Sequence, residues 1–145
     1  MENIYVKFNS YLADLVVSYL KLHDLHWNVK GRQFVEVHKY TEALYENFAE
    51  KFDEVAERMI MSGVKPISTI EAYLKATDVK ELGQVEYRDG EVLEIVLKGL
   101  EALRAKAREL RKEFDENGLI PEANLLDGHI EYYDKEIWFL SSMIK

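Results

Sequence analysis

Four side chains with metal-binding chemistry lie between residues 26 and 57. His26 and His38 offer imidazole nitrogens, and Asp53 and Glu57 offer carboxylate oxygens. This mixture of ligands suits iron, zinc or manganese. Because Asp53 and Glu57 are four residues apart, on a helix they share one face and can both reach one metal ion or a close pair of ions. The residue types and their spacing therefore indicate a candidate metal site.

The elements that carry these residues follow from the apolar pattern. Apolar residues recur every three or four positions, which predicts amphipathic helices over 4–29, from 33 or 34 to 61, over 90–114, and from Pro121 onward. His26 takes the next place in the rhythm of the first helix, so we expect it on the packing face. The predicted packing positions also include Ile60 and Ile144.

The connection between the second and third helices is long. It has roughly 25 residues, whereas adjacent helices of a bundle are usually joined by about two to eight. The chain therefore has room to run back along the bundle, so that the third helix lies parallel to the second. Ser68 or Thr69 is predicted to cap a short helix within this crossover. The sequence thus predicts an all-α four-helix bundle, a single domain over 1–145, with one long crossover carrying a short extra helix.

Helix geometry separates the two halves of the candidate site. Fifteen residues of continuous helix from His38 to Asp53 rise about 22 Å, whereas ligand atoms of one metal lie about 4 Å apart. His26 and His38 flank a turn and can approach each other. A shared site therefore requires two antiparallel chains related by a two-fold axis near Glu46 and Asn47, and an isologous dimer would contain two such sites.

Spacing alone leaves a second interpretation open. A lone histidine on an apolar helix face is usually a core residue, and an acidic pair four residues apart is usually solvated. No histidine follows a glutamate by three residues, so the Glu-x-x-His pairs that form a di-iron site inside one bundle are absent.

Composition narrows the functional classes. The formal charge of -8 disfavours non-specific attraction to nucleic acid or to an anionic membrane. The chain contains no cysteine, which excludes disulfides, thiolate metal sites and cysteine nucleophiles. No apolar run approaches the ~18 residues of a membrane span, and residues 1–10 do not resemble a secretory leader. We therefore expect a cytoplasmic protein with no membrane partner.

A combined motif resembles the signature of the Dps family, the dodecameric mini-ferritins known as DNA-binding proteins from starved cells. It consists of LHWNVKG at 25–31, then Phe34, His38, Leu44-Tyr45 and DEVAER at 53–58. Pro66, Ser68-Thr69, the short crossover helix and DKEIW at 134–138 also resemble the family. The resemblance covers nearly the whole chain.

The resemblance implies a ferritin-like bundle, a homododecameric hollow shell built from two-fold dimers, and ferroxidase sites at the dimer interfaces. By position, His26, His38, Asp53 and Glu57 match the metal ligands, and Trp27 matches a tryptophan beside the site. The implied activity is oxidation of Fe(II) by hydrogen peroxide or dioxygen, with storage of ferric mineral and protection against oxidative stress. Zinc or manganese are alternative metals for the same site.

The sequence departs from the family in two respects. Many relatives carry a lysine-rich tail that binds DNA, and none is present here, so direct DNA binding is not expected. The region that lines the iron-entry pore in the family offers only Glu122 and Asp127 as acidic candidates. His23 and His129 match no ligand and are interpreted as surface or core residues. The tyrosines at 5, 11, 19 and 45 are interpreted as packing residues.

Two other functional classes stay open at this point. One is a nucleoid-binding or signalling shell in which iron oxidation is secondary. The other is a structural bundle whose metal site is vacant. A salt-dependent shift of DNA would favour the first class, and failure to oxidise Fe(II) would favour the second.

Overall fold

The computed structural model describes residues 2–145, and nearly all of them lie in helices. Four long helices form the bundle and a short fifth helix lies in the crossover: α1 (Glu2–Asn28), α2 (Phe34–Met61), α3 (Ile70–Ala76), α4 (Asp89–Glu116) and α5 (Ile120–Ile144). The predicted fold class, with its long crossover and extra helix, is confirmed. The predicted helix ends agree with the observed ones to within two residues.

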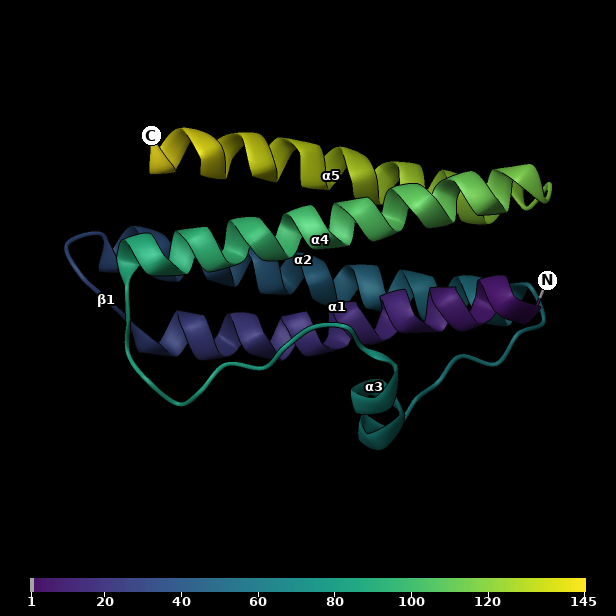
Figure 1. The fold of residues 1–145 in the computed structure, drawn as a ribbon, viewed down its shortest axis with the longest axis horizontal. Coiled ribbons are helices and arrows are strands. Elements are labelled where there is room, and N and C mark those ends of the chain that lie inside the picture. The colour runs from purple at the N-terminus through teal and green to yellow at the C-terminus, as the bar shows by residue number, and fades with distance from the viewer. Residues whose placement is uncertain (1) are drawn as a thin grey trace.

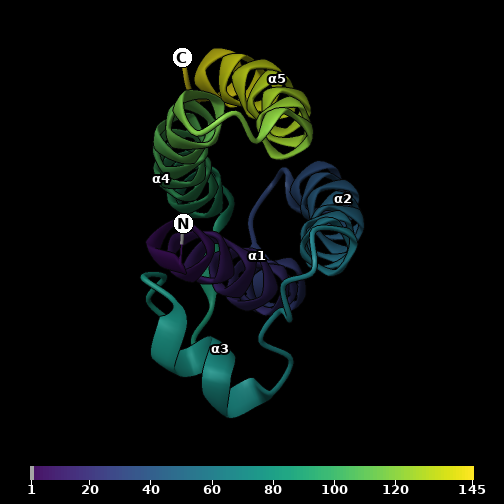
Figure 2. The ribbon, with the colours of Figure 1, turned by 90° about the vertical axis from the view of Figure 1, so that its right-hand side faces the viewer.

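The long helices lie side by side, with α1 and α2 joined at one end of the bundle and α4 and α5 joined at the other (Figure 1). The crossover runs back along the outside of α1, so α4 has the same direction as α2. Viewed along the bundle, α5 faces α1 across the core and α3 packs outside α1 (Figure 2). Thr69 caps α3, because its side chain accepts a hydrogen bond from the Ala72 backbone N–H.

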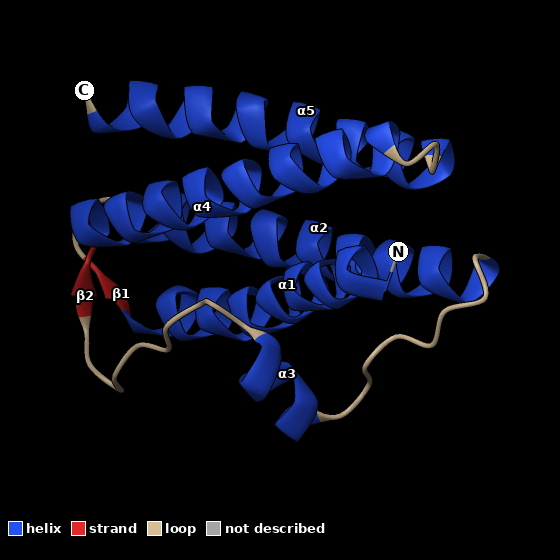
Figure 3. Cartoon of the chain, turned by 45° about the vertical axis from the view of Figure 1, so that its right-hand side comes forward, coloured by secondary structure: helices blue, strands red, loops and turns tan. Residues whose placement is uncertain are grey.

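Two very short parallel strands, β1 (Val29–Lys30) and β2 (Tyr87–Arg88), lie at the end of the bundle where α1 meets α2 (Figure 3). Val29 pairs with Tyr87, and Lys30 pairs with Arg88. The sequence pattern does not predict this pairing, because two residues per strand are too few to produce an alternation of apolar and polar residues. The pairing ties the α1–α2 turn to the beginning of α4.

The core consists of the apolar stripes of the four long helices. The largest fully buried side chains are Tyr11, Tyr133, Phe8, Phe114, Ile4, Leu12, Leu15, Leu25, Leu44, Met59, Leu100 and Leu126. Two predicted packing positions are wrong. Ile60 is 62% exposed and Ile144 is 37% exposed. Met59 takes the inward position in the last part of α2, and adjacent helical residues point about 100° apart, so Ile60 faces outward. Ile144 lies in the last turn of α5.

A buried ion pair fastens the crossover to the bundle. Asp14 is 4% exposed, and the Lys106 ammonium donates hydrogen bonds to its carboxylate at 2.7 Å and to that of Asp78 at 2.8 Å. The other Asp14 oxygen accepts hydrogen bonds from the Thr77 hydroxyl and the Asp78 backbone N–H. The carboxylate of α1 thus holds both α4 and the chain just after α3.

A second polar cluster lies in the core between α1, α2 and α5. The Tyr11 hydroxyl lies 2.8 Å from His129 Nδ1 and 2.6 Å from the Tyr133 hydroxyl. His129 is 3% exposed, and its Nε2 has no hydrogen-bond partner among residues 2–145. Burial, and to a smaller extent the nearby charge of Lys51, lower the pKa of His129 to about 3. His129 is therefore a neutral core histidine.

Candidate metal centre

His26 and His38 are brought together by the turn between α1 and α2. His26 Nδ1 lies 2.6 Å from the main-chain oxygen of His38, and His38 Nδ1 lies 2.9 Å from the main-chain oxygen of His26. The two rings stack with centroids 3.5 Å apart and an interplanar angle of 17°. Because the carbonyl of His26 is one of the last four of α1, it would otherwise lack a helical partner. The hydrogen bond from His38 therefore satisfies a carbonyl at the end of α1 and also fixes the orientation of the His38 ring.

These hydrogen bonds assign the same tautomer to both rings. A carbonyl oxygen can only accept, so each Nδ1 carries the proton and donates it. Each Nε2 then keeps its lone pair for a metal ion, as in metal sites where the other ring nitrogen is held by a carbonyl. Burial lowers the pKa of His26, and the charge of His38 lowers it further, while the hydrogen bond to the His38 carbonyl opposes both effects. The neutral, metal-binding form of His26 is favoured.

Two further residues of α2, neither of them among the predicted ligands, lie beside the histidine pair. The Thr41 hydroxyl lies 3.0 Å from His26 Nδ1, and Glu42 Oε1 lies 3.9 Å from His26 Nε2. Glu42 follows His38 by four residues, so the two side chains share one helix face. That spacing is the signal that could have marked Glu42 as a neighbour of the site.

An aromatic group borders the histidine pair. The His23 ring stacks on Tyr45 with centroids 3.7 Å apart, and Tyr45 meets the His26 ring edge-on at 5.3 Å. Trp27 also packs against His23, with ring centroids 5.3 Å apart and the rings tilted by 58°, and it is 63% exposed. His23 and Tyr45 therefore have packing roles here. Trp27 lies at the edge of the group, open to solvent in one chain.

Asp53 and Glu57 lie far from the histidines. Both are exposed on α2, and α2 is helical without interruption from Phe34 to Met61, so the rise of about 22 Å from His38 to Asp53 applies in full. No group of three or more His, Asp or Glu side chains that could hold a metal ion occurs within residues 2–145 of one chain. The structure thus brings His26 and His38 together and leaves the carboxylates apart from them.

One of the two pore candidates is excluded by its burial. Glu122 is 1% exposed, and its carboxylate accepts hydrogen bonds of 2.7 Å from the hydroxyls of Tyr5 and Ser62. The prediction that Glu122 lines a pore is therefore wrong, because this carboxylate faces the inside of its own bundle. Asp127 is exposed and bonds Arg111 at 2.9 Å.

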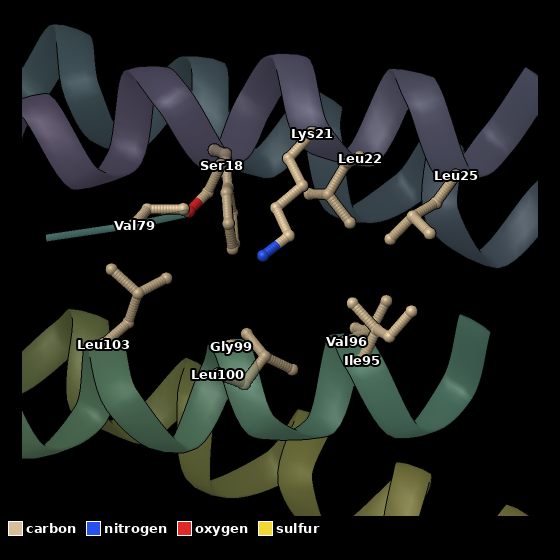
Figure 4. Close-up of a pocket in the computed structure, with 11 residues that line it drawn as sticks. Ser18, Lys21, Leu22, Leu25, Val79, Ile95, Val96, Gly99, Leu100 and Leu103 are labelled. Atoms are coloured by element: carbon tan, nitrogen blue, oxygen red, sulfur yellow. The ribbon is translucent and has the colours of Figure 1, made fainter. Parts of the chain in front are cut away.

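A small cavity lies between α1 and α4, with Lys21 pointing into it (Figure 4). Its volume is about 50 Å³, whereas small-molecule pockets usually span about 300–1,000 Å³. Its lining is mostly apolar, burial lowers the pKa of Lys21, and none of the four predicted metal ligands lines it. The cavity is a packing gap apart from the candidate metal centre.

The comparisons with known proteins agree with this architecture. The model of the family described as Ferritin-like domain matches residues 6–145. A DNA protection during starvation protein from Helicobacter pylori is 34% identical over 130 residues, which cover 90% of each chain. The chain belongs to the Dps family. The resemblance inferred from the sequence motifs is therefore confirmed.

Solved structures of other proteins share the fold of this Dps-family chain. The crystal structure of CAIP from Helicobacter cinaedi is 34% identical, has a TM-score of 0.94, and the match covers 98% of this chain and 99% of that one. The Dps protein from Vibrio cholerae O1, described as a member of a broad superfamily of ferritin-like diiron-carboxylate proteins, is 26% identical with a TM-score of 0.94 over 99% of this chain and 90% of that one. No helix within residues 2–145 is long and apolar enough to cross a membrane.

Proposed function

We propose that this Dps-family chain is a cytoplasmic ferroxidase and iron store. It binds Fe(II) at sites shared between two chains, oxidises it with hydrogen peroxide or dioxygen, and stores ferric mineral inside a homododecameric shell built from two-fold dimers. Iron storage with protection of DNA during starvation fits the family, and the names of its relatives state the protection. The choice of peroxide, the ligand set and the dodecamer are parts of the proposal.

The observation that carries the proposal is the arrangement of His26 and His38. Each ring is held by a hydrogen bond from its Nδ1 to a main-chain oxygen, which leaves two neighbouring Nε2 lone pairs ready for a metal ion. Packing in a core does not require two histidines to be oriented with both Nε2 atoms available side by side. Two nitrogen ligands are too few for a metal site, so the remaining ligands must come from elsewhere.

Asp53 and Glu57 are the proposed source of those ligands, supplied by the partner chain. They are exposed, share one face of α2, and lie outside every salt bridge found within residues 2–145. An antiparallel dimer through the middle of α2 would bring the carboxylates of each chain to the histidines of the other. Their negative charge offsets the charge that iron gains when it becomes ferric.

The proposed reaction balances with peroxide as the oxidant. Each Fe(II) loses one electron, and a pair of electrons breaks the O–O bond of hydrogen peroxide. Water supplies the remaining oxygen of the ferric oxyhydroxide, and protons are released to solvent. No hydroxyl radical is formed when both electrons arrive together at one peroxide. Trp27, exposed at the edge of the site, is proposed to capture oxidising equivalents that escape this pairing.

The test measures peroxide-driven oxidation of Fe(II). The purified protein is loaded with Fe(II) without oxygen, peroxide is added, and formation of ferric species is followed by absorbance, with dioxygen in a parallel run. We expect fast oxidation by the wild type and slow oxidation by His38→Ala. Light scattering should give the mass of twelve chains. A monomer at micromolar concentration, or equal rates for protein and buffer, would contradict the proposal.

A further inference from the structure

We propose that Asp89, the first residue of α4, is a positioning residue for the histidine half of the metal centre. It holds the α1–α2 turn in the conformation in which His26 and His38 bond each other's main chain. This inference rests on the proposed function for its biological meaning, although its main readout is independent of iron oxidation. Neither the metal-binding motif nor the helix pattern singles out Asp89.

The Asp89 carboxylate binds the beginning of α2. Its Oδ2 accepts a hydrogen bond of 2.9 Å from the backbone N–H of Gln33. Gln33 is the N-cap residue of α2, and its own side chain makes no capping hydrogen bond. The carboxylate of another helix thus contacts the α2 terminus where a local cap is missing. The backbone hydrogen bonds from Gln33 and Gly90 lower the pKa of Asp89.

The position of Asp89 also places one negative charge near two helix N-termini. It lies in the first turn of α4, and Gln33 directly precedes α2. Helix N-termini carry partial positive charge, so parallel α2 and α4 would repel each other at this end of the bundle. A carboxylate between them offsets that repulsion and holds the ends together.

Gly31 shows how closely Asp89 fits the turn. Gly31 has a φ of +135°, and a Cβ built on it would lie 2.3 Å from Asp89 Oδ2 and 2.6 Å from Asp89 Cγ. A side chain at position 31 would therefore face both backbone strain and a collision with the carboxylate. The β1–β2 pairing holds Val29 and Lys30, the two residues before Gly31.

The short distances along the chain connect this clamp to the histidines. His26 lies three residues before Val29, and His38 lies five residues after Gln33. The reciprocal hydrogen bonds of 2.6 and 2.9 Å require the end of α1 and the beginning of α2 to stay in register, because hydrogen bonds weaken steeply with distance and misalignment. Release of the turn would let the two rings lose this register.

The test compares Asp89→Ala with Glu91→Ala as a matched control. The Glu91 carboxylate accepts a hydrogen bond of 2.9 Å from the Arg88 N–H, so it caps the same end of α4 and is not bonded to the turn. In assembled, metal-free protein labelled with ¹⁵N-histidine, we expect wild type and Glu91→Ala to show the slowly exchanging Nδ1–H signals of His26 and His38. Asp89→Ala should lose them. Titration with Co(II) should show about tenfold weaker binding for Asp89→Ala and an unchanged Kd for Glu91→Ala.

Two further variants keep the test decisive if Asp89→Ala fails to fold. Asp89→Asn retains an oxygen that can accept the Gln33 N–H, so we expect it to restore the Nδ1–H signals. Gly31→Ala should displace the carboxylate and lose them, with circular dichroism confirming helicity. Intact Nδ1–H signals in either Asp89→Ala or Gly31→Ala would overturn the positioning role, whatever the iron chemistry. Lost signals together with absent iron oxidation in the wild type would uphold the positioning role and contradict the proposed function.

Discussion

His26 and His38 each donate a ring hydrogen bond to the main-chain oxygen of the other, at 2.6 and 2.9 Å. The pair therefore joins the end of α1 to the beginning of α2 and at the same time selects the tautomer that leaves both Nε2 atoms free. Loss of either ring removes one potential ligand and also one restraint on the other ring. Substitution of either histidine should accordingly weaken metal binding by more than the loss of one ligand alone would.

The two-chain site can be tested by mixing defective proteins. His38→Ala and Asp53→Ala should each slow Fe(II) oxidation. If the chains are dissociated, mixed and reassembled at random, half of the dimers contain one chain of each kind, and one site of each such dimer is intact. Activity should then recover to roughly a quarter of wild type. Recovery requires that both variants assemble, which gel filtration of each one establishes beforehand.

An unchanged, low activity in the mixture would mean that all four ligands come from a single chain. That result would conflict with the unbroken α2, which keeps His38 and Asp53 about 22 Å apart. Each variant dissociated and reassembled on its own provides the control for activity lost during reassembly.

The buried His129 should make stability depend on pH. Its pKa of about 3 in the folded protein lies below the ordinary value of about 6.5, so below pH 6.5 the unfolded chain binds the proton first. The stabilisation is complete above pH 6.5 and is lost as the pH falls toward 3. Between pH 6.5 and pH 5 this group alone should lower the unfolding free energy by about 2 kcal/mol.

Urea unfolding of the wild type and of His129→Phe across that pH window tests this contribution, because titratable groups distant from His129 contribute equally to both curves. The Glu54 carboxylate lies 3.6 Å from His129 Nε2, so Glu54→Gln is compared in both backgrounds. The wild type should lose stability more steeply toward pH 5. Parallel pH profiles for the two proteins would show that His129 titrates as an ordinary histidine.

The Asp14–Lys106 pair should be important for folding. Asp14 is 4% exposed, so Lys106→Met leaves a buried carboxylate without its cation and should cost about 3–5 kcal/mol. Lys112→Met is the control on the same helix. Its side chain is 80% exposed and its ammonium lies 4.0 Å from the Glu116 carboxylate, and an exposed pair contributes about 0–1 kcal/mol. Equal urea midpoints for the two variants would contradict a stabilising role of the buried pair.

Direct DNA binding should be absent. With a net charge of -8, the protein as a whole repels the phosphate backbone, so we expect no retardation of plasmid in a gel at physiological salt and neutral pH. A chelator in one arm excludes bridging by divalent metal ions. Tight retardation that weakens with added salt would reveal a basic surface that the net charge conceals.

The periodic parts of the structure could be predicted from the sequence, and the contacts between distant side chains and backbone could not. The four long helices, the crossover and the separation of His38 from Asp53 follow from helix periodicity and rise. Burial of Glu122 depends on Tyr5, 117 residues away, and the Asp89–Gln33 contact spans 56 residues. Such contacts leave no repeating trace in the sequence.

The pairing of β1 with β2 also has a consequence for the order of folding. The His26–His38 contacts close a loop of 12 residues, whereas the pairing of Val29 with Tyr87 closes one of 58 residues by their numbering. The longer closure costs about 1.4 kcal/mol more in chain entropy. We therefore expect the α1–α2 hairpin to form early with its rings already paired, and the crossover to lock that hairpin only when α4 docks.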